Sequence, residues 1–294
     1  MAHVSVLLNE VLSAIHPQPG QFIVDATAGG GGHAKAIAER VKPGGKVLAI
    51  DWDAQELGEL KDELRREGYD NVILAHGNFK NLSEIARKNN FPAPHAVLFD
   101  LGFSFWHIER ASRGFTFQKD EPLDMRYDPT DATRPTAEQI INSASKEELA
   151  GILREYGEEY SARRIAEAIA EYRKKATIKT TGQLAEIITK VKYRRGRAHP
   201  ATKTFQALRI AVNEEFENIR HGLRSAQGAA RPGAKIAVIT FHSLEDRIVK
   251  NIFRDWQKDN FGKVLTKKVI KPTREELISN PRSRSAKLRV FQLL

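Results

Sequence analysis

The stretch Asp25–Ile37 reads DATAGGGGHAKAI and holds the residues whose types and spacing most clearly suggest chemistry in this 294-residue chain. Four consecutive glycines follow a short apolar run, Phe22–Val24, and precede residues that predict a helix. A glycine turn after a strand lets the backbone approach a ligand closely and presents N–H groups at a helix start. Dinucleotides, phosphates and S-adenosylmethionine all bind at such turns, so the turn alone does not identify the ligand.

Two acidic residues near the glycines narrow the choice of ligand. Asp25 is expected to end the first strand, where its carboxylate can accept a hydrogen bond from an ammonium group and would repel a pyrophosphate. Asp51 is expected to end the second strand, a common place for a carboxylate that accepts hydrogen bonds from two ribose hydroxyls. Together they favour an adenosine nucleoside with a zwitterionic amino-acid tail over a dinucleotide.

Two further residues follow the next predicted strands. Phe79, in the segment HGNF, can stack on or flank an adenine, and Asp100, in FDLG, ends the fourth strand. Ligands of open α/β sheets lie beyond the carboxyl ends of the strands, so these residues should converge there with Asp25 and Asp51. Each alone could be a helix N-cap or a core ring, but their positions at successive strand ends favour a binding site.

The elements that must position these residues alternate between buried strands and charged helices. This alternation predicts βαβ units and a parallel sheet. Residues 105–204 look helical, with a capping box at Ser145 and Glu148, and residues 205–223 predict one long amphipathic helix. The seven expected strands are Phe22–Val24, Lys46–Ile50, Val72–Ala75, Ala96–Phe99, Lys235–Phe241, Val264–Ile270 and Leu288–Leu294.

The predicted fold is therefore α/β, with a Rossmann-like seven-stranded sheet that ends in an antiparallel pair and carries an inserted all-helical domain. Such a sheet is typical of class I S-adenosylmethionine-dependent methyltransferases, although fold analogy is a weak argument for function. The expected sheet domain has two parts, residues 1–105 and 205–294, and the helical insertion is residues 106–204.

Composition limits the possible partners. The net charge of +10, with basic clusters in Lys190–Lys203 and Lys263–Arg289, favours nucleic acid. The absence of cysteine excludes disulfides, cysteine-ligated zinc and thiol catalysis, and no metal-ligand spacing stands out. No apolar run approaches the roughly 20 residues of a membrane span, and the start of the sequence does not resemble a signal peptide. A cytoplasmic protein is the expectation.

Several long motifs resemble the RsmH (MraW) family of methyltransferases. In order they are HVSVLLNEV, DATAGGGGH, AIDWD, HGNF, DLG, RGFTF, PLDMRYDP, HPATKTFQALRIAVNEE, PGAKIAVITFHSLEDRIVK and NPRSRSAKLR. The resemblance spans essentially the whole chain. It implies a class I methyltransferase domain with a helical insertion, and S-adenosylmethionine-dependent methylation of the exocyclic amine of one cytidine near the decoding centre of bacterial 16S rRNA.

The resemblance also implies a set of cofactor contacts, to which the strand-end position adds Asp25. His33 is expected to act through its backbone, and His107 stands where the family usually has Gln. By position the contacts fall on Gly31, Gly32, His33, Asp51, Phe79, Asp100 and His107. This chain departs from the family in reading DLGFSFWH, where Phe103, Phe105 and Trp106 replace smaller residues. These rings can stack on a substrate base or fill the domain junction, and packing is slightly favoured.

Asp100 is the expected catalytic residue, because it can contact the cofactor or accept a hydrogen bond from the target amine. The candidate substrate contacts are Phe103, Phe105, Arg113, Arg126, Arg194, Arg195 and His242. For the arginines a solvated loop is an equal alternative. The segment around His242 equally suits a helix N-cap at Ser243.

Other functions stay open on the sequence alone. An amino-methyltransferase for DNA or another RNA would have the same cofactor site, and a non-catalytic ribosome-assembly factor would have the same basic surface. A nicotinamide dehydrogenase ranks last because of Asp25. The expected partner is 16S rRNA within the small ribosomal subunit, and the oligomeric state is open, with a dimer among the options.

Overall fold

The computed structural model describes residues 5–193 and 199–294, which form two compact units. The sheet unit comprises the chain up to Ser104 and Phe216–Leu294, and the helical unit is Phe105–Glu215. The sequence places the end of the insertion at residue 204, whereas the compact helical unit runs to Glu215. Within the described ranges, no helix is both long enough and apolar enough to cross a membrane.

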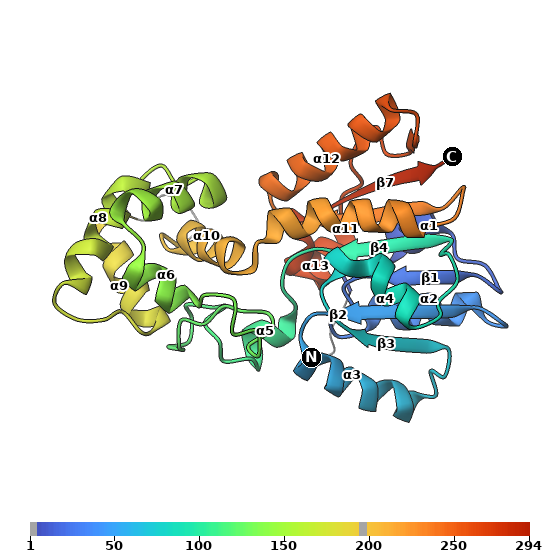
Figure 1. Ribbon diagram of the computed structural model, residues 1–294, viewed down its shortest axis with the longest axis horizontal. Helices are drawn as coiled ribbons and strands as arrows, with labels where there is room; N and C mark the ends of the chain where they lie inside the picture. Colours follow the sequence, from blue (N-terminus) through green and yellow to red (C-terminus); the bar gives the residue numbers. More distant parts are fainter. Residues whose placement is uncertain (1–4, 194–198) are drawn as a thin grey trace. The chain divides into compact units, whose positions relative to one another are not determined.

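The sheet unit is built on seven strands in the order β3-β2-β1-β4-β5-β7-β6. The first five strands pair in parallel, and β7 pairs antiparallel with both β5 and β6 (Figure 1). This mixed sheet confirms the predicted class I methyltransferase fold. The strands are β1 (Phe22–Asp25), β2 (Lys46–Asp51), β3 (Val72–His76), β4 (Ala96–Asp100), β5 (Lys235–Thr240), β6 (Gly262–Val264) and β7 (Lys287–Leu293).

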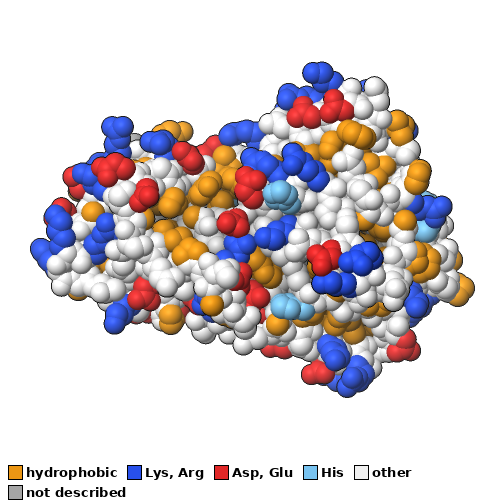
Figure 2. Space-filling model, viewed as in Figure 1, with side chains coloured by type: hydrophobic (Ala, Val, Ile, Leu, Met, Phe, Trp, Pro, Cys, Tyr) orange, Lys and Arg blue, Asp and Glu red, His pale blue; other side chains and the backbone are white. Residues whose placement is uncertain are grey.

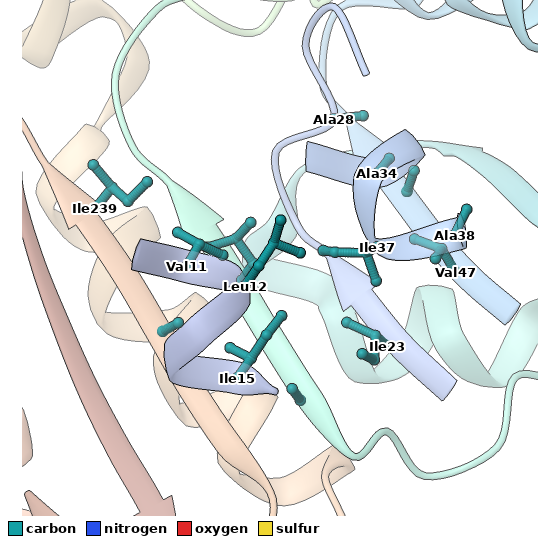
Figure 3. Packing of buried hydrophobic residues seen from close by; sticks show 14 of the residues in the cluster. Val11, Leu12, Ile15, Ile23, Ala28, Ala34, Ile37, Ala38, Val47 and Ile239 are labelled. Carbon is teal, nitrogen blue, oxygen red and sulfur yellow. The ribbon is translucent and has the colours of Figure 1, made fainter. Parts of the chain in front are cut away.

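Helices cover both faces of this sheet. They are α1 (Leu8–Ile15), α2 (Gly32–Val41), α3 (Ala54–Glu67), α4 (Leu82–Lys88), α11 (Glu215–Ala229), α12 (Ser243–Lys258) and α13 (Arg274–Ser279), with short turns η1 (Phe79–Asn81) and η2 (Pro281–Ser285). Successive strand residues point to opposite faces, so Ile23 joins the buried cluster under α1, α2 and α3, and Val24 joins the one under α4, α11 and α12. Figure 3 shows Leu12 of α1 beside Ile37 of α2 on the first face.

The helical unit has its own apolar core. Its helices are α5 (Phe105–Glu109), α6 (Ala137–Ser143), α7 (Lys146–Gly157), α8 (Ala162–Arg173), α9 (Thr181–Val191) and α10 (Thr202–Asn213). The predicted capping box of α7 is confirmed, because the Glu148 N–H donates to Ser145 Oγ at 3.2 Å and the Ser145 N–H donates to Glu148 Oε2 at 2.7 Å. The apolar faces of α7, α8 and α9 meet in this core, where Leu149, Ile165 and Leu184 are buried.

The single long helix predicted for residues 205–223 is wrong, because the structure divides it into α10 and α11. Glu214, between them, has a φ of 50°, which lies outside the helical region. Asn213 is buried at the end of α10, where its Oδ1 accepts the Tyr127 N–H at 2.9 Å and its Nδ2 donates to the Met125 carbonyl at 2.7 Å. These bonds to a distant loop fix the end of α10, and the apolar periodicity does not reveal them.

The strand predicted for Val264–Ile270 is largely wrong, because β6 ends at Val264. The Val290 N–H of β7 donates to the side-chain hydroxyl of Thr266 at 2.9 Å in place of a backbone carbonyl. Pairing returns only as an isolated bridge at Ile270. A side-chain acceptor therefore interrupts the regular ladder and lets this edge segment bulge.

Thr266→Val should destabilise the sheet unit by about 1–3 kcal/mol, because it leaves the buried Val290 N–H without its acceptor. Thr266→Ser keeps the hydroxyl and is the matched control. Urea unfolding followed by circular dichroism measures the difference. Equal stability of the valine variant and the wild type would contradict the role assigned to the hydroxyl.

Candidate active site

Three acidic residues stand at the carboxyl ends of adjacent strands. Asp25 ends β1, Asp51 ends β2 and Asp100 ends β4. Since β1 lies between the other two strands and all three are parallel, the carboxylates gather at one end of the sheet, where the glycine turn follows β1. The structure thus brings together the acids that the sequence places at strand ends.

The glycine turn uses its glycines for packing as well as for conformation. Gly31 has a φ of 77°, a left-handed value that disfavours a side chain. A Cβ atom on Gly31 would lie 2.3 Å from a methyl carbon of Leu60, and one on Gly32 would lie 2.0 Å from the Ser5 hydroxyl. Helix α2 begins at Gly32, as predicted. A side chain at Gly31 or Gly32 would therefore force the Leu60 or the Ser5 side chain to move.

The Asp25 carboxylate is fully buried and only half satisfied. Its Oδ1 accepts the Thr27 N–H at 3.2 Å, whereas its buried Oδ2 has no hydrogen-bond partner in the described part of the chain. Burial raises the pKa of Asp25 to about 7, against the opposing effects of His33 and the Thr27 N–H. A buried oxygen without a donor is costly, so the site fits a ligand that supplies a donor such as an ammonium group.

His33, which is buried, and Asp100, which is half-buried, form a polar pair next to Asp25. The His33 Nε2 atom lies 3.5 Å from Asp100 Oδ2. Burial alone lowers the pKa of His33, but the contact with Asp100 and the charges of Asp100 and Asp25 outweigh it, so the pKa is raised. Asp100 Oδ1 is buried and has no hydrogen-bond partner among the residues described. The sequence assigns His33 a backbone contact, and the structure adds that its ring faces the acids.

Asp51 holds the glycine turn with both carboxylate oxygens. Oδ2 accepts the Gly29 N–H at 2.7 Å, and Oδ1 accepts the Asp53 N–H at 2.9 Å. Asp53 in turn caps α3 by accepting the N–H groups of Gln55 and Glu56 at 2.9 and 3.3 Å. Since each carboxylate oxygen can accept more than one hydrogen bond, these two bonds are compatible with acceptance from ribose hydroxyls.

Glu56 is a site residue that the sequence pattern does not reveal. It is buried in the first turn of α3, and its Oε2 accepts the Ser104 Oγ at 2.8 Å. Its Oε1 would lie 3.7 Å from a Cβ on Gly29, so the carboxyl adjoins the glycine turn. Burial, together with the charge of Asp51, raises the pKa of Glu56 to about 9. Acids are common in first helical turns, so nothing in the sequence marks this one as neutral and buried.

Phe79 and His107, both predicted cofactor contacts, lie in different units. Phe79 begins η1 after β3, is half-buried, and has a ring atom that would lie 2.5 Å from a Cβ on Gly222 of α11. His107 belongs to the helical unit, where its buried ring centroid lies 4.8 Å from that of Phe115 and 5.1 Å from that of Tyr127. Phe79 stays a candidate contact beside the sheet, whereas His107 packs in an aromatic cluster of the helical unit.

Arg113 and Arg126, predicted to contact RNA phosphates, both form hydrogen bonds within a loop of the helical unit. Arg113 is buried, and its Nη1 donates to the Arg126 and Tyr127 carbonyls at 3.0 and 2.9 Å. Arg126 Nε and Nη2 donate to the two carboxylate oxygens of Asp124 at 2.7 and 2.8 Å. One guanidinium is thus inside the loop and the other is paired with an acid, and a contact of either with RNA stays a prediction.

His242 acts as the N-cap of α12, in the position that the sequence pattern gives to Ser243. Its Nδ1 accepts the Glu245 N–H at 3.4 Å, and its Nε2 lies 3.2 Å from Glu245 Oε1. The helix-start alternative is therefore observed with a different capping residue. A contact between His242 and substrate stays a prediction.

The remaining predicted substrate contacts fall into three places. Phe103 lies in the sheet unit, three residues after Asp100, and 38% of its surface is exposed. Phe105 begins α5 in the helical unit. Arg194 and Arg195 lie outside the described residues. Of these four, Phe103 has the position and the exposure that a base-stacking ring beside Asp100 requires.

Glu56→Gln should stabilise the protein by on the order of 5 kcal/mol at pH 9 and have little effect near pH 5. Folded Glu56 keeps its proton up to about pH 9, whereas in an unfolded chain it loses the proton near its ordinary value of 4.5. Wild-type stability therefore falls as the pH rises through this window, and glutamine removes that loss while still accepting from Ser104.

Denaturant unfolding at pH 5, 7 and 9 measures this effect. Asp62→Asn, an exposed acid of the same helix whose charge does not contribute to the raised pKa of Glu56, is the control and should track the wild type. A difference between Glu56→Gln and wild type that stays constant with pH would show that Glu56 is not held neutral.

The chain is similar in sequence to a known family and to named relatives. The chain matches the model of the MraW methylase family over residues 1–294. It is 42% identical to the protein named ribosomal RNA small subunit methyltransferase H of Syntrophotalea carbinolica, over 99% of this chain and 98% of that protein. It is 47% identical to the protein of the same name from Persephonella marina, with 98% of each covered. The resemblance stated from the sequence is confirmed, and the chain belongs to the MraW methylase family.

Proposed function

We propose that this protein uses S-adenosylmethionine to methylate the exocyclic N4 amine of one cytidine in the decoding region of bacterial 16S rRNA. The reaction takes place in the cytoplasm, on RNA within the small ribosomal subunit. Membership of a methylase family and the names of the relatives support the reaction and the RNA class. The observation that carries the proposal is the pair of buried carboxylate oxygens without hydrogen-bond partners, among the described residues, at Asp25 Oδ2 and Asp100 Oδ1.

The donor set around the glycine turn fits S-adenosylmethionine. Asp25 Oδ2 would accept from the ammonium group of the amino-acid tail, and Asp51 would accept from the ribose hydroxyls. Phe79 would flank the adenine. A nicotinamide dinucleotide fits less well, because its pyrophosphate would face the buried Asp25 carboxylate.

Asp100 is best placed to act on the target amine. When bound, S-adenosylmethionine supplies a methyl group already activated by a positively charged sulfur. The cytosine amine is a poor nucleophile because its lone pair is delocalised into the ring. An N–H of the amine can donate to Asp100 Oδ1, which reduces that delocalisation and orients the nitrogen. The other oxygen, Oδ2, stays beside His33, so the carboxylate is held while it accepts.

Phe103 would hold the target base. A base must leave its stack to reach an acceptor at the end of a strand, and an aromatic ring then replaces the lost stacking. Phe103 follows Asp100 closely and is 38% exposed, so its ring is accessible to a base.

Affinity for S-adenosylmethionine should fall as the pH drops through about 7, by roughly tenfold per pH unit well below that value. Asp25 has a pKa of about 7, so its carboxyl is neutral at lower pH and cannot pair with an ammonium group. Asp25→Asn should bind more weakly at pH 8 and lose most of the pH dependence. His33, Asp51 and Asp100 also face Asp25 and remain in the variant.

Titration calorimetry from pH 5.5 to 8.5 tests this expectation. Asp62→Asn, an exposed carboxylate on α3, is the matched control and should behave as the wild type. A wild-type affinity that does not change over this range would contradict the role of Asp25.

Asp100→Asn should lower kcat by about a hundredfold or more, because the amide is a weaker acceptor and can present an N–H to the target amine. The assay follows labelled methyl transfer to small ribosomal subunits from cells that lack the gene, with mass spectrometry of the released nucleosides. Wild-type protein should yield N4-methylcytidine. Full activity and unchanged cofactor affinity in Asp100→Asn would exclude both roles given to this residue.

The same assay separates the alternative functions. Faster transfer to duplex DNA or to another RNA would indicate a different amino-methyltransferase. Binding to the small subunit without any methyl transfer would indicate an assembly factor. Unchanged N4-methylation of cytidine in cells that lack the gene would overturn the proposal.

A further inference from the structure

Charge alone does not locate an RNA-binding surface on this protein. Figure 2 shows Lys and Arg side chains spread over the visible face, with Asp and Glu among them. Exposed aromatic rings are a sharper guide, because every nucleic-acid base has a face that can stack on one. Tyr160 is 98% exposed and Tyr193 is 80% exposed, the two highest values among the large apolar side chains described, and both belong to the helical unit.

A fixed turn presents the Tyr160 ring to solvent. Tyr160 lies between α7 and α8, directly after Glu159, whose side chain is buried and pairs with Lys192 Nζ. Also before the ring, the Glu158 carbonyl accepts the Lys203 ammonium at 2.7 Å, and after the ring the Ser161 N–H donates to Glu159 Oε1 at 2.9 Å. The backbone on both sides of the ring is therefore tied down, and a ring held in this way loses little conformational entropy when a partner binds.

One cation lies beside this ring, and two more follow it closely in the sequence. The Lys203 Nζ atom lies 4.9 Å from the centroid of the Tyr160 ring. Arg163 and Arg164 are exposed in the first turn of α8, and the described residues offer neither of them an ion-pair partner. Positive charge near the N-terminus of a helix destabilises the helix by about 0.3–1 kcal/mol per residue. The two arginines therefore do not stabilise α8. The turn also carries one exposed acid, Glu158.

Tyr193 lies close to the same turn. It directly follows Lys192, whose ammonium contacts both Glu159 and, at 2.9 Å, the Pro200 carbonyl. Each of the two exposed tyrosines is thus next in sequence to one member of the Lys192–Glu159 ion pair. The helical unit brings together, at one corner, two exposed rings from segments that are far apart in the chain.

We propose that the Tyr160 surface, defined as Tyr160, Arg163, Arg164 and Lys203, binds a single-stranded segment of the substrate RNA. One base stacks on the Tyr160 ring, and the neighbouring phosphates lie beside the cations. Proteins hold single-stranded nucleic acid by this combination of stacking and positive charge, whereas they hold duplex RNA mainly through its shape, phosphates and 2′-hydroxyls. The proposal rests on the proposed function for the identity of the RNA, and it names how that RNA is held.

Tyr160→Ala tests the surface in the full-length protein. The probe is a single-stranded RNA of about 20 nucleotides and mixed sequence, with binding measured by fluorescence anisotropy. Removal of the stacking ring should weaken binding by about 5- to 100-fold, whereas Tyr160→Phe should keep most of the affinity. The matched control is Phe261→Ala, which removes an exposed ring from the sheet unit.

Arg163→Gln together with Arg164→Gln tests the cations. The slope of log affinity against log salt should become shallower by about 0.7 for each RNA phosphate that the variant no longer neutralises. Arg254→Gln, an exposed arginine of α12, is the control. For all variants, melting temperature and the Kd for S-adenosylmethionine should match the wild type, and for the Tyr160 and arginine variants KM for small subunits should rise while kcat stays constant.

The outcomes separate this proposal from the proposed function. RNA affinity and KM of Tyr160→Ala within twofold of wild type would overturn the Tyr160 surface even if the protein methylates cytidine. Weaker binding to intact small subunits with unchanged binding to naked RNA would show that the surface contacts a ribosomal protein, and this also overturns it. Absence of methyl transfer by the wild type would refute the proposed function and leave the binding result standing.

Discussion

The burial of Asp25 at the end of β1 is the constraint on which the site depends. Leaving a carboxylate oxygen without a donor costs about 1–3 kcal/mol, and Asp25 Oδ2 has none among the described residues. The strand tolerates this because Ile23 and Val24 are fully buried in the clusters on its two faces. Those contacts keep the strand end from shifting toward water. The packing of the apolar core therefore holds the Asp25 carboxylate in an environment that is unfavourable for it.

The elements around Asp25 limit the negative charge of the site. Asp51 uses both oxygens to hold backbone N–H groups, which disperses its charge. Glu56 lies beside it and avoids a second charge by keeping its proton, because burial and Asp51 raise its pKa to about 9. Neutral Glu56 can then accept from Ser104, four residues after Asp100. The segment that carries Phe103 is thereby tied to the same acids that frame the glycine turn.

The sequence predicts those features of the fold and the site that depend on residues close together in the chain. Short apolar runs reveal the strands, and the residues directly after them reveal Asp25, Asp51 and Asp100, since parallel strands end together. It fails where a side chain bonds to a segment far away in the sequence. The Thr266 hydroxyl takes the place of a backbone carbonyl beside β7, and hydrogen bonds from Asn213 to a distant loop fix the end of α10. Each of these residue types has an ordinary local role, so the local pattern indicates that role.

Comparison of Asp25 with Asp53 shows why strand-end position alone cannot assign a role. Both carboxylates are fully buried, and both lie just beyond or at the end of a strand. Asp53 is satisfied as an N-cap by two backbone N–H groups of α3, which is a structural role. Asp25 Oδ2 faces no donor in the described chain, which supports the proposal that a ligand completes its hydrogen bonding. A capping acid and a proposed binding acid therefore differ in their hydrogen bonds. The fold supplies the donors for Asp53, whereas it supplies none for Asp25 Oδ2.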